Sequence, residues 1–62
     1  MEERLLKIEE IADRLNVTTE TINNYRRRRI NPIPFFKLGG AIRFRWSEVE
    51  EWLERQRVRK GA

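Results

Sequence analysis

The stretch IEEIADRLNVTTETINNYRRRR, residues 8–29, decides the fold of this chain. Its first half repeats apolar side chains at the helical spacing i, i+3, i+4 and i+7, namely at Ile8, Ile11, Ala12 and Leu15. Asn16 then interrupts this pattern, and asparagine tolerates the left-handed backbone of a tight turn. The first half therefore predicts a short amphipathic helix that ends in a turn.

A second helix is predicted over residues 19–29, because Thr18 is a favourable N-cap residue. Ile22 and Tyr25 are its only inward-facing apolar residues. A helix with so little apolar surface is expected to lie half exposed. Two helices joined by a three-residue turn, the second of them polar and basic, are typical of a helix-turn-helix.

A β-hairpin is predicted after this pair of helices. Pro32 and Pro34 favour an extended connection over residues 31–34. Residues 35–38 and 41–45 then read as two strands on either side of a glycine pair. We expect a three-residue loop, Gly39-Gly40-Ala41, because it separates an apolar face from a basic one.

This loop fixes the expected strand pairing. Leu38 would lie opposite Ile42, and Phe36 opposite Phe44, all on the apolar face. The other face would carry the cations of the hairpin: Lys37 opposite Arg43, followed by Arg45.

A third helix is predicted over residues 48–57, with Ser47 as N-cap and Glu50 completing a capping box. The residues expected to face inward or to anchor the helix are Trp46, Val49, Trp52 and Leu53. The predicted fold class is mainly α with a β-hairpin wing, a winged helix-turn-helix in the order α-α-β-β-α. We expect one domain over residues 1–62, with an ordered core at about 5–57 and a basic tail at 55–62.

Positive charge is concentrated in the middle of the chain. Residues 21–46 contain seven cations and no acid: Arg26, Arg27, Arg28, Arg29, Lys37, Arg43 and Arg45. The first twenty residues hold three cations against six acids, and the last sixteen hold four against four. Basic runs are often only solvated surface, but cations on a polar helix and a hairpin favour a nucleic-acid partner.

Several function classes are disfavoured by composition. The chain has no His and no Cys, so zinc sites, disulfides and the usual nucleophile–base pairs are not expected. We expect no enzyme activity, no metal, no cofactor and no small-molecule ligand. No stretch approaches the ~18 apolar residues of a membrane span. A cytoplasmic protein of bacterial or phage type, associated with the nucleoid, is expected.

Five segments resemble the small excisionase and AlpA-type members of the MerR-like winged-helix superfamily. They are residues 5–15 (LLKIEEIADRL), Val17-Thr18 with Thr21-Ile22, residues 34–40 (PFFKLGG), residues 43–45 (RFR) and residues 47–53 (SEVEEWL). The chain departs from these members at Asn16, where Gly is common, and in a longer, more basic segment over residues 26–34. The resemblance implies that the second helix enters the major groove and that the wing reaches the backbone or minor groove.

The expected contacts follow from this docking. On the second helix they are Thr18, Thr19, Glu20, Thr21, Asn23, Asn24, Arg26, Arg27 and Arg28. On the wing they are Lys37, Gly39, Gly40, Ala41, Arg43 and Arg45. Thr19, Glu20 and Asn23 are expected at base edges, because Asn can read adenine and Glu can accept from cytosine.

Sequence-specific binding of double-stranded DNA is therefore the predicted function. The resemblance implies an excisionase-like architectural factor that acts with a site-specific recombinase and with further copies of itself on adjacent sites. A small transcription regulator of the same fold is the first alternative. A protein-interaction module, such as a phage DNA-packaging subunit domain, is an alternative of another class.

Overall fold

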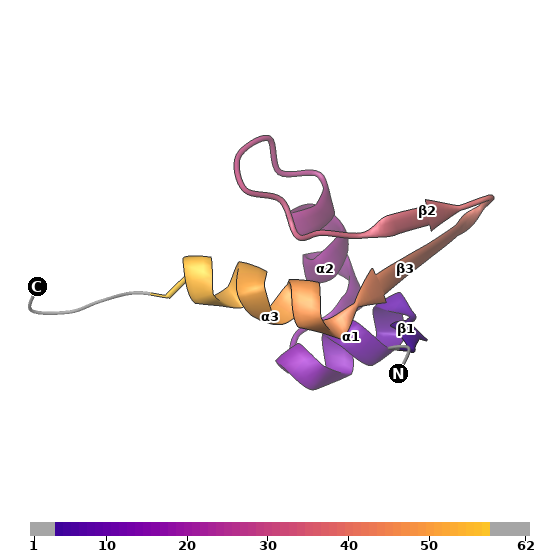
Figure 1. The fold of residues 1–62 in the computed structure, drawn as a ribbon, viewed down its shortest axis with the longest axis horizontal. Helices are drawn as coiled ribbons and strands as arrows, with labels where there is room; N and C mark the ends of the chain where they lie inside the picture. Colours follow the sequence, from indigo (N-terminus) through magenta and orange to yellow (C-terminus); the bar gives the residue numbers. More distant parts are fainter. Residues whose placement is uncertain (1–3, 58–62) are drawn as a thin grey trace, which may run out of the picture.

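Three helices pack against a small antiparallel sheet in the computed structural model, which describes residues 4–57 (Figure 1). In chain order the elements are β1 (Leu5–Leu6), α1 (Ile8–Leu15), α2 (Thr19–Arg26), β2 (Phe36–Leu38), β3 (Ala41–Arg45) and α3 (Trp46–Arg55). The β2–β3 hairpin, hereafter the wing, projects away from the helices on the side opposite the end of α3. The winged helix-turn-helix predicted from the sequence is confirmed.

Local capping fixes the helix-turn-helix as expected. Asn16 adopts the left-handed conformation, with φ 59° and ψ 45°, and ends α1. The Thr18 hydroxyl accepts from the backbone N–H of Thr21 at 3.1 Å and caps α2. Lys7 precedes α1, and its backbone N–H donates to the Glu10 carboxylate at 2.7 Å. Glu10 therefore supplies the side-chain cap that Lys7 cannot supply.

Helix α2 ends at Arg26, three residues before the predicted end at residue 29. The chain then turns back through Asn31, which has a positive φ of 56°. This turn buries Ile33 completely and lets its N–H donate to the Tyr25 carbonyl at 3.3 Å. Burial of one isoleucine in the core thus outweighs the helix propensity of the arginine run.

The predicted pairing of the wing is wrong. Leu38 lies opposite Ala41, Lys37 opposite Ile42, and Phe36 opposite Arg43. The connection is therefore the two-residue turn Gly39-Gly40, and Gly39 has the positive φ, 61°, expected at the first position of a type II′ turn.

Each wing face consequently mixes polar and apolar residues. Lys37 shares the core-side face with Ile42 and Phe44, whereas Arg43 and Arg45 lie on the opposite face with Phe36 and Leu38. The prediction that these three cations share one face is therefore wrong. Leu38 is 51 % exposed, because the wing extends beyond the core.

Strand β1 was not predicted. Leu5 pairs with Arg45 and Leu6 with Phe44, which gives a three-stranded sheet in the order β1-β3-β2. Leu6 and Phe44 are both buried on the face that meets the helices. Two residues carry too little pattern to mark a strand.

Helix α3 begins two residues earlier than predicted, with Arg45 rather than Ser47 at the N-cap. Strand β3 leads directly into the helix, so Ser47 lies within its first turn. Val49 and Trp52 are buried as expected. The predicted basic tail is described only as far as Arg57, and its remainder, residues 58–62, lies outside the described residues.

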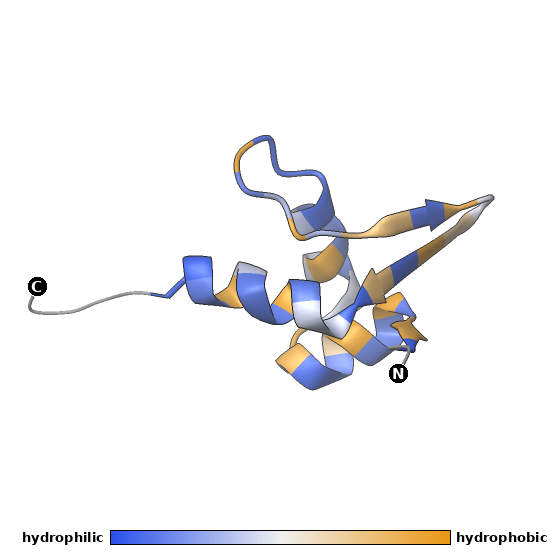
Figure 2. Ribbon diagram, in the orientation of Figure 1, coloured by the Kyte–Doolittle hydropathy of each residue, from blue (hydrophilic) through white to orange (hydrophobic). Residues whose placement is uncertain are grey.

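Eight buried side chains form the core: Leu6, Ile11, Ala12, Ile22, Ile33, Phe44, Val49 and Trp52. They come from all three helices, the sheet and the connection between α2 and β2. In Figure 2 hydrophobic and hydrophilic segments alternate along the helices, and the end of α2 and the loop after it are mostly hydrophilic. The indole N–H of Trp52 donates to the Asn31 carbonyl at 2.8 Å and so ties that loop to α3.

Replacing Gly39 with alanine should destabilise the wing. An L residue in the left-handed region costs about 1–2 kcal/mol, and Gly39 has φ 61°. Gly40→Ala is the matched control, since Gly40 has no positive φ and a Cβ there would meet open space. Urea unfolding should show a lower midpoint for G39A only. Equal midpoints for both variants would contradict the observed turn.

A second prediction concerns acid stability. The Lys7 backbone N–H lowers the pKa of Glu10; burial opposes this effect, and the Arg4 guanidinium adds to the lowering. A lowered pKa in the folded state means stability that is present above the ordinary carboxyl pKa and lost as the pH falls through the folded value. Glu10→Gln should flatten the decline in urea midpoint between about pH 6 and pH 3. An unchanged profile would show that the α1 cap carries no charge-dependent stability.

Candidate nucleic-acid interface

The outward face of α2 is entirely polar. Thr19, Glu20, Asn24 and Arg27 are exposed, whereas Ile22 on the opposite face is fully buried. Residues 20, 24 and 27 recur at helical spacing, so their side chains lie along one stripe. None of these three has a hydrogen bond or ion pair from its side chain within residues 4–57. The stripe is thus free to meet an external partner.

Thr18 and Thr21 lie at the start of this helix and are engaged with each other. Their hydroxyl oxygens are 2.9 Å apart, and Thr18 also accepts from the Thr21 backbone. These contacts confirm the capping role expected of Thr18. The N-terminus of α2 is consequently capped and presents Thr19 and Glu20 just beyond the cap.

Arg26 joins α2 to the base of the wing. Its Nη2 and Nε donate to Asn23 Oδ1 at 2.7 and 3.2 Å. Its guanidinium also lies 5.0 Å from the centre of the Phe35 ring, within cation–π distance. The i, i+3 spacing of Asn23 and Arg26 permitted this contact, but sequence reasoning missed it.

This contact changes what Asn23 can offer. Reading adenine by two hydrogen bonds needs both the oxygen and the nitrogen of an amide. Arg26 already donates twice to the Asn23 oxygen, whereas the amide nitrogen has no partner within the described chain. Asn23 and Arg26 therefore present a donor surface together, and Asn24 is the amide with both ends open.

The arginine run divides between two directions. Arg26 points toward the wing, whereas Arg28 Nη1 donates to Gln56 on α3 at 3.5 Å and lies 5.9 Å from the Tyr25 ring. Arg27 and Arg29 are exposed, and neither side chain has a partner in the part of the chain that is described. The four cations thus form no single patch.

The wing offers a narrow, open tip. Gly39 and Gly40 are exposed, and a Cβ built on either meets nothing within 4 Å. Lys37 is exposed near this tip and has no side-chain partner among residues 4–57, while Ala41 is half-buried opposite Leu38. This tip allows close approach of another backbone.

The remaining wing cations have contacts of their own. Arg43 is half-buried and donates from Nη1 to the Ile42 carbonyl at 2.8 Å. Arg45 lies 5.2 Å from the Phe36 ring centre, and its Nη1 is 3.7 Å from the Glu48 carboxylate. Glu48 partly neutralises Arg45, so Arg43 and Lys37 carry most of the positive charge of the wing.

A further basic group adjoins Arg43 and was missed in the sequence. Arg4 and Lys7 line the same shallow hollow as Arg43 and Glu10. Arg4 forms a salt bridge with Glu10, which leaves Lys7 and Arg43 as its cations without an acid partner. The pairing of β1 with β3 brings these residues together, and nothing in the sequence marked β1.

Comparison with known proteins places the chain in a family. A family model described as a helix-turn-helix domain matches residues 5–57, which span β1 through α3. No curated protein and no solved structure matches the chain. Within residues 4–57, no helix is both long and apolar enough to cross a membrane. The chain belongs to this helix-turn-helix domain family, and a helix-turn-helix domain indicates DNA binding.

Proposed function

We propose that the protein binds double-stranded DNA in a sequence-specific manner, with α2 in the major groove and the wing on the adjoining backbone. The observation that carries the proposal is the polar stripe of α2 followed by an acid-free stretch with seven cations. Glu20 is the only acid on α2, and the other acids of the described chain lie on α1 and α3. A phosphate backbone therefore meets little repulsion along this surface.

Base reading is assigned to the stripe. Thr19, Glu20 and Asn24 would meet base edges, with Asn24 in the role first expected of Asn23. Asn23 and Arg26 would act as one donor group beside them. Arg27 would reach the groove or the backbone. Thr18, Thr21 and Arg28 are secondary contacts, because their side chains already bind neighbours within the fold.

Phosphate binding is assigned to the wing and its surroundings. Lys37 and Arg43 would hold phosphates on either face of the wing, and Arg45 would contribute less because of Glu48. Gly39, Gly40 and Ala41 would let the tip approach the sugar–phosphate backbone closely.

An excisionase-like role is the finer proposal. It is supported by the resemblance of residues 5–53 to small excisionase and AlpA-type proteins of the MerR-like superfamily. A single module of this size covers only ~600–1,000 Å² of DNA. Useful affinity would come from further copies on adjacent sites and from a site-specific recombinase, acting on DNA in the cytoplasm.

The test is site selection from a random duplex pool, followed by anisotropy titrations against the selected site over a range of salt. Neutralising ~4–6 phosphates should give a slope of log affinity against log salt near −4 to −5. Arg43→Ala should weaken all sequences alike and flatten the slope by about one unit. Asn24→Ala should instead relax the preference at one base pair and leave the slope unchanged.

Two results would contradict the proposal. An affinity that does not depend on salt would show that the protein makes no phosphate contacts. A loss of affinity that is uniform over all sequences in both variants would show that Arg43 and Asn24 do not have different roles. Selected sites that lie beside recombination sites would support the excisionase-like role. Selected sites within promoters would favour the transcription regulator instead.

A further inference from the structure

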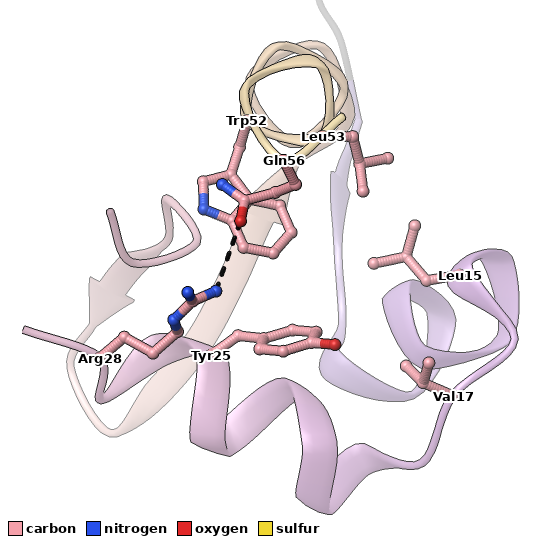
Figure 3. Close-up of a pocket in the computed structure, with 7 residues that line it drawn as sticks. All are labelled: Leu15, Val17, Tyr25, Arg28, Trp52, Leu53 and Gln56. Atoms are coloured by element: carbon pink, nitrogen blue, oxygen red, sulfur yellow. Dashed lines mark hydrogen bonds between the residues drawn. The ribbon is translucent and has the colours of Figure 1, made fainter. Parts of the chain in front are cut away.

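A hollow lies between the helices, away from the wing. Seven residues line it: Leu15, Val17, Tyr25, Arg28, Trp52, Leu53 and Gln56. Figure 3 shows Leu15 and Val17 on one side, Arg28 on the other, and the rings of Tyr25 and Trp52 between them. We call this hollow the α2–α3 pocket. Its lining residues come from α1, the turn after it, α2, the residues that follow α2, and α3 with its C-cap.

The walls of the pocket suit one large apolar side chain. Its volume is about 210 Å³, above the roughly 150 Å³ of a dry apolar cavity that holds benzene. Tyr25 and Trp52 meet at a ring-centre distance of 5.3 Å and form an aromatic floor. Leu15, Val17 and Leu53 supply aliphatic sides. Such walls offer nothing to a phosphate backbone.

The rim of the pocket carries the cation Arg28, which favours an occupant with negative charge. Arg28 donates to Gln56 Oε1, which orients the amide so that Nε2 points away from the cation. Gln56 Nε2 is buried and has no hydrogen-bond partner among residues 4–57. An unpaired buried donor is costly, and a rotation of the Gln56 side chain would let it donate to a carboxylate held beside Arg28. No acidic residue lines the pocket.

We propose that the α2–α3 pocket docks a segment of a partner protein that presents one large apolar side chain next to a carboxylate. The apolar side chain would lie on Tyr25 and Trp52. The carboxylate would pair with Arg28, which is exposed, and would accept from Gln56 Nε2 once that side chain turns toward it. This site is separate from the α2 stripe and from the wing, because its lining includes no residue of either. Arg28, a secondary contact of the proposed DNA surface, is the one residue that the two surfaces share.

The exposed apolar residues of the described chain lack this chemistry. In the described chain the exposed large hydrophobic residues are Ile30, Phe35 and Leu38. All three lie within residues 21–46, which contain no acid. Outside residues 4–57, Met1 stands beside Glu2 and Glu3, whereas the residues after Arg57 carry no acidic side chain. Because each copy carries a net charge of +4, charge complementarity favours a different, acidic protein over a second copy of this chain.

The experiment is an NMR titration of the isotope-labelled full chain without DNA. The probe is a capped pentapeptide, Glu-Leu-Phe-Asp-Glu. Its controls are Gln-Leu-Phe-Asn-Gln, which lacks the charge, and Glu-Ala-Ala-Asp-Glu, which lacks the apolar side chains. The probe should shift the Trp52 indole and Gln56 side-chain resonances with a dissociation constant of about 1 mM or tighter. Each control peptide should bind about tenfold more weakly.

Gln56→Glu tests the rim without disturbing the packing. The new carboxylate would pair with Arg28 and repel the probe, so binding should fall at least about tenfold. Arg55→Gln is the matched control, because it changes net charge by the same amount on α3 and Arg55 does not line the pocket. R55Q should bind the probe nearly as well as the unchanged chain.

Five results would overturn the proposal. The first is the absence of any resonance shift at the pocket residues. The second is equal affinity for the probe and the uncharged peptide, and the third is an equal loss of probe affinity in Q56E and R55Q. The fourth is a shift of the same resonances on raising the protein concentration alone, which would place a second copy in the pocket. Sodium phenylacetate binding as tightly as the peptide would likewise replace a protein partner by a small carboxylate ligand. Salt-dependent DNA binding measured in parallel shows whether the proposed function fails separately.

Discussion

Replacing Trp52 with alanine is expected to leave much of the protein unfolded at 25 °C. Truncating a buried tryptophan costs about 3–5 kcal/mol, and a core of this size supplies only ~3–5 kcal/mol of net stability. Trp52 is 2 % exposed, packs on Tyr25 and donates its indole N–H to Asn31. Circular dichroism with urea should show loss of helix and of the cooperative transition.

Two further variants make this expectation specific. Trp52→Phe keeps most of the buried ring but loses the hydrogen bond to Asn31, so it should fold with reduced stability. Trp46→Ala removes the same side chain from a half-buried position beside Arg14 and should cost less than W52A. If W46A unfolded the protein and W52A did not, the core would be assigned to the wrong tryptophan.

Replacing Arg26 with lysine should lower the affinity for the selected DNA site by about tenfold, on the proposed function. Lysine keeps the charge but loses the paired bonds to Asn23 and the planar contact with Phe35. The donor group that Asn23 and Arg26 form beside the α2 stripe would therefore lose its fixed arrangement. Affinity for unrelated duplex and the salt slope should stay unchanged, because no charge is removed.

Arg29→Lys is the control for this variant. Arg29 is exposed and its side chain has no partner within residues 4–57, so lysine should replace it with little effect. Anisotropy titrations with the selected and a scrambled duplex measure both variants. Equal affinities of R26K and the unchanged chain for the selected site would show that the Arg26–Asn23 contact plays no part in recognition.

The helix-turn-helix was predictable because its signals are local. The spacing of Ile8, Ile11 and Leu15, the asparagine turn and the Thr18 cap each depend on a few neighbouring residues. The end of α2 was not predictable in the same way. It depends on the burial of Ile33 against residues far along the chain, and isolated propensity favoured a longer helix.

The pairing of the wing was mispredicted for a different reason. The predicted pairing required the core to select the face that carries Leu38 and Phe36. The wing instead extends beyond the core, so burial does not act on its tip, and Leu38 remains exposed. The turn preference of Gly39 then decides the pairing.

The candidate site was predictable as a surface but not as a set of contacts. Helical spacing correctly placed Glu20, Asn24 and Arg27 on the polar side of α2. The direction of each arginine was not available, since it depends on partners from other elements. Phe35 before β2 holds Arg26, and Gln56 after α3 holds Arg28.

The hydrogen bond between the Trp52 indole and Asn31 couples two regions that are distant in sequence. Asn31 precedes the buried Ile33 and the Phe35 ring beneath Arg26, so the base of the wing cannot shift without disturbing α3. Thermodynamic linkage makes such coupling reciprocal. A substitution in α3 would thus change the affinity for duplex DNA. Bound DNA would in turn protect the α3 amides from hydrogen exchange.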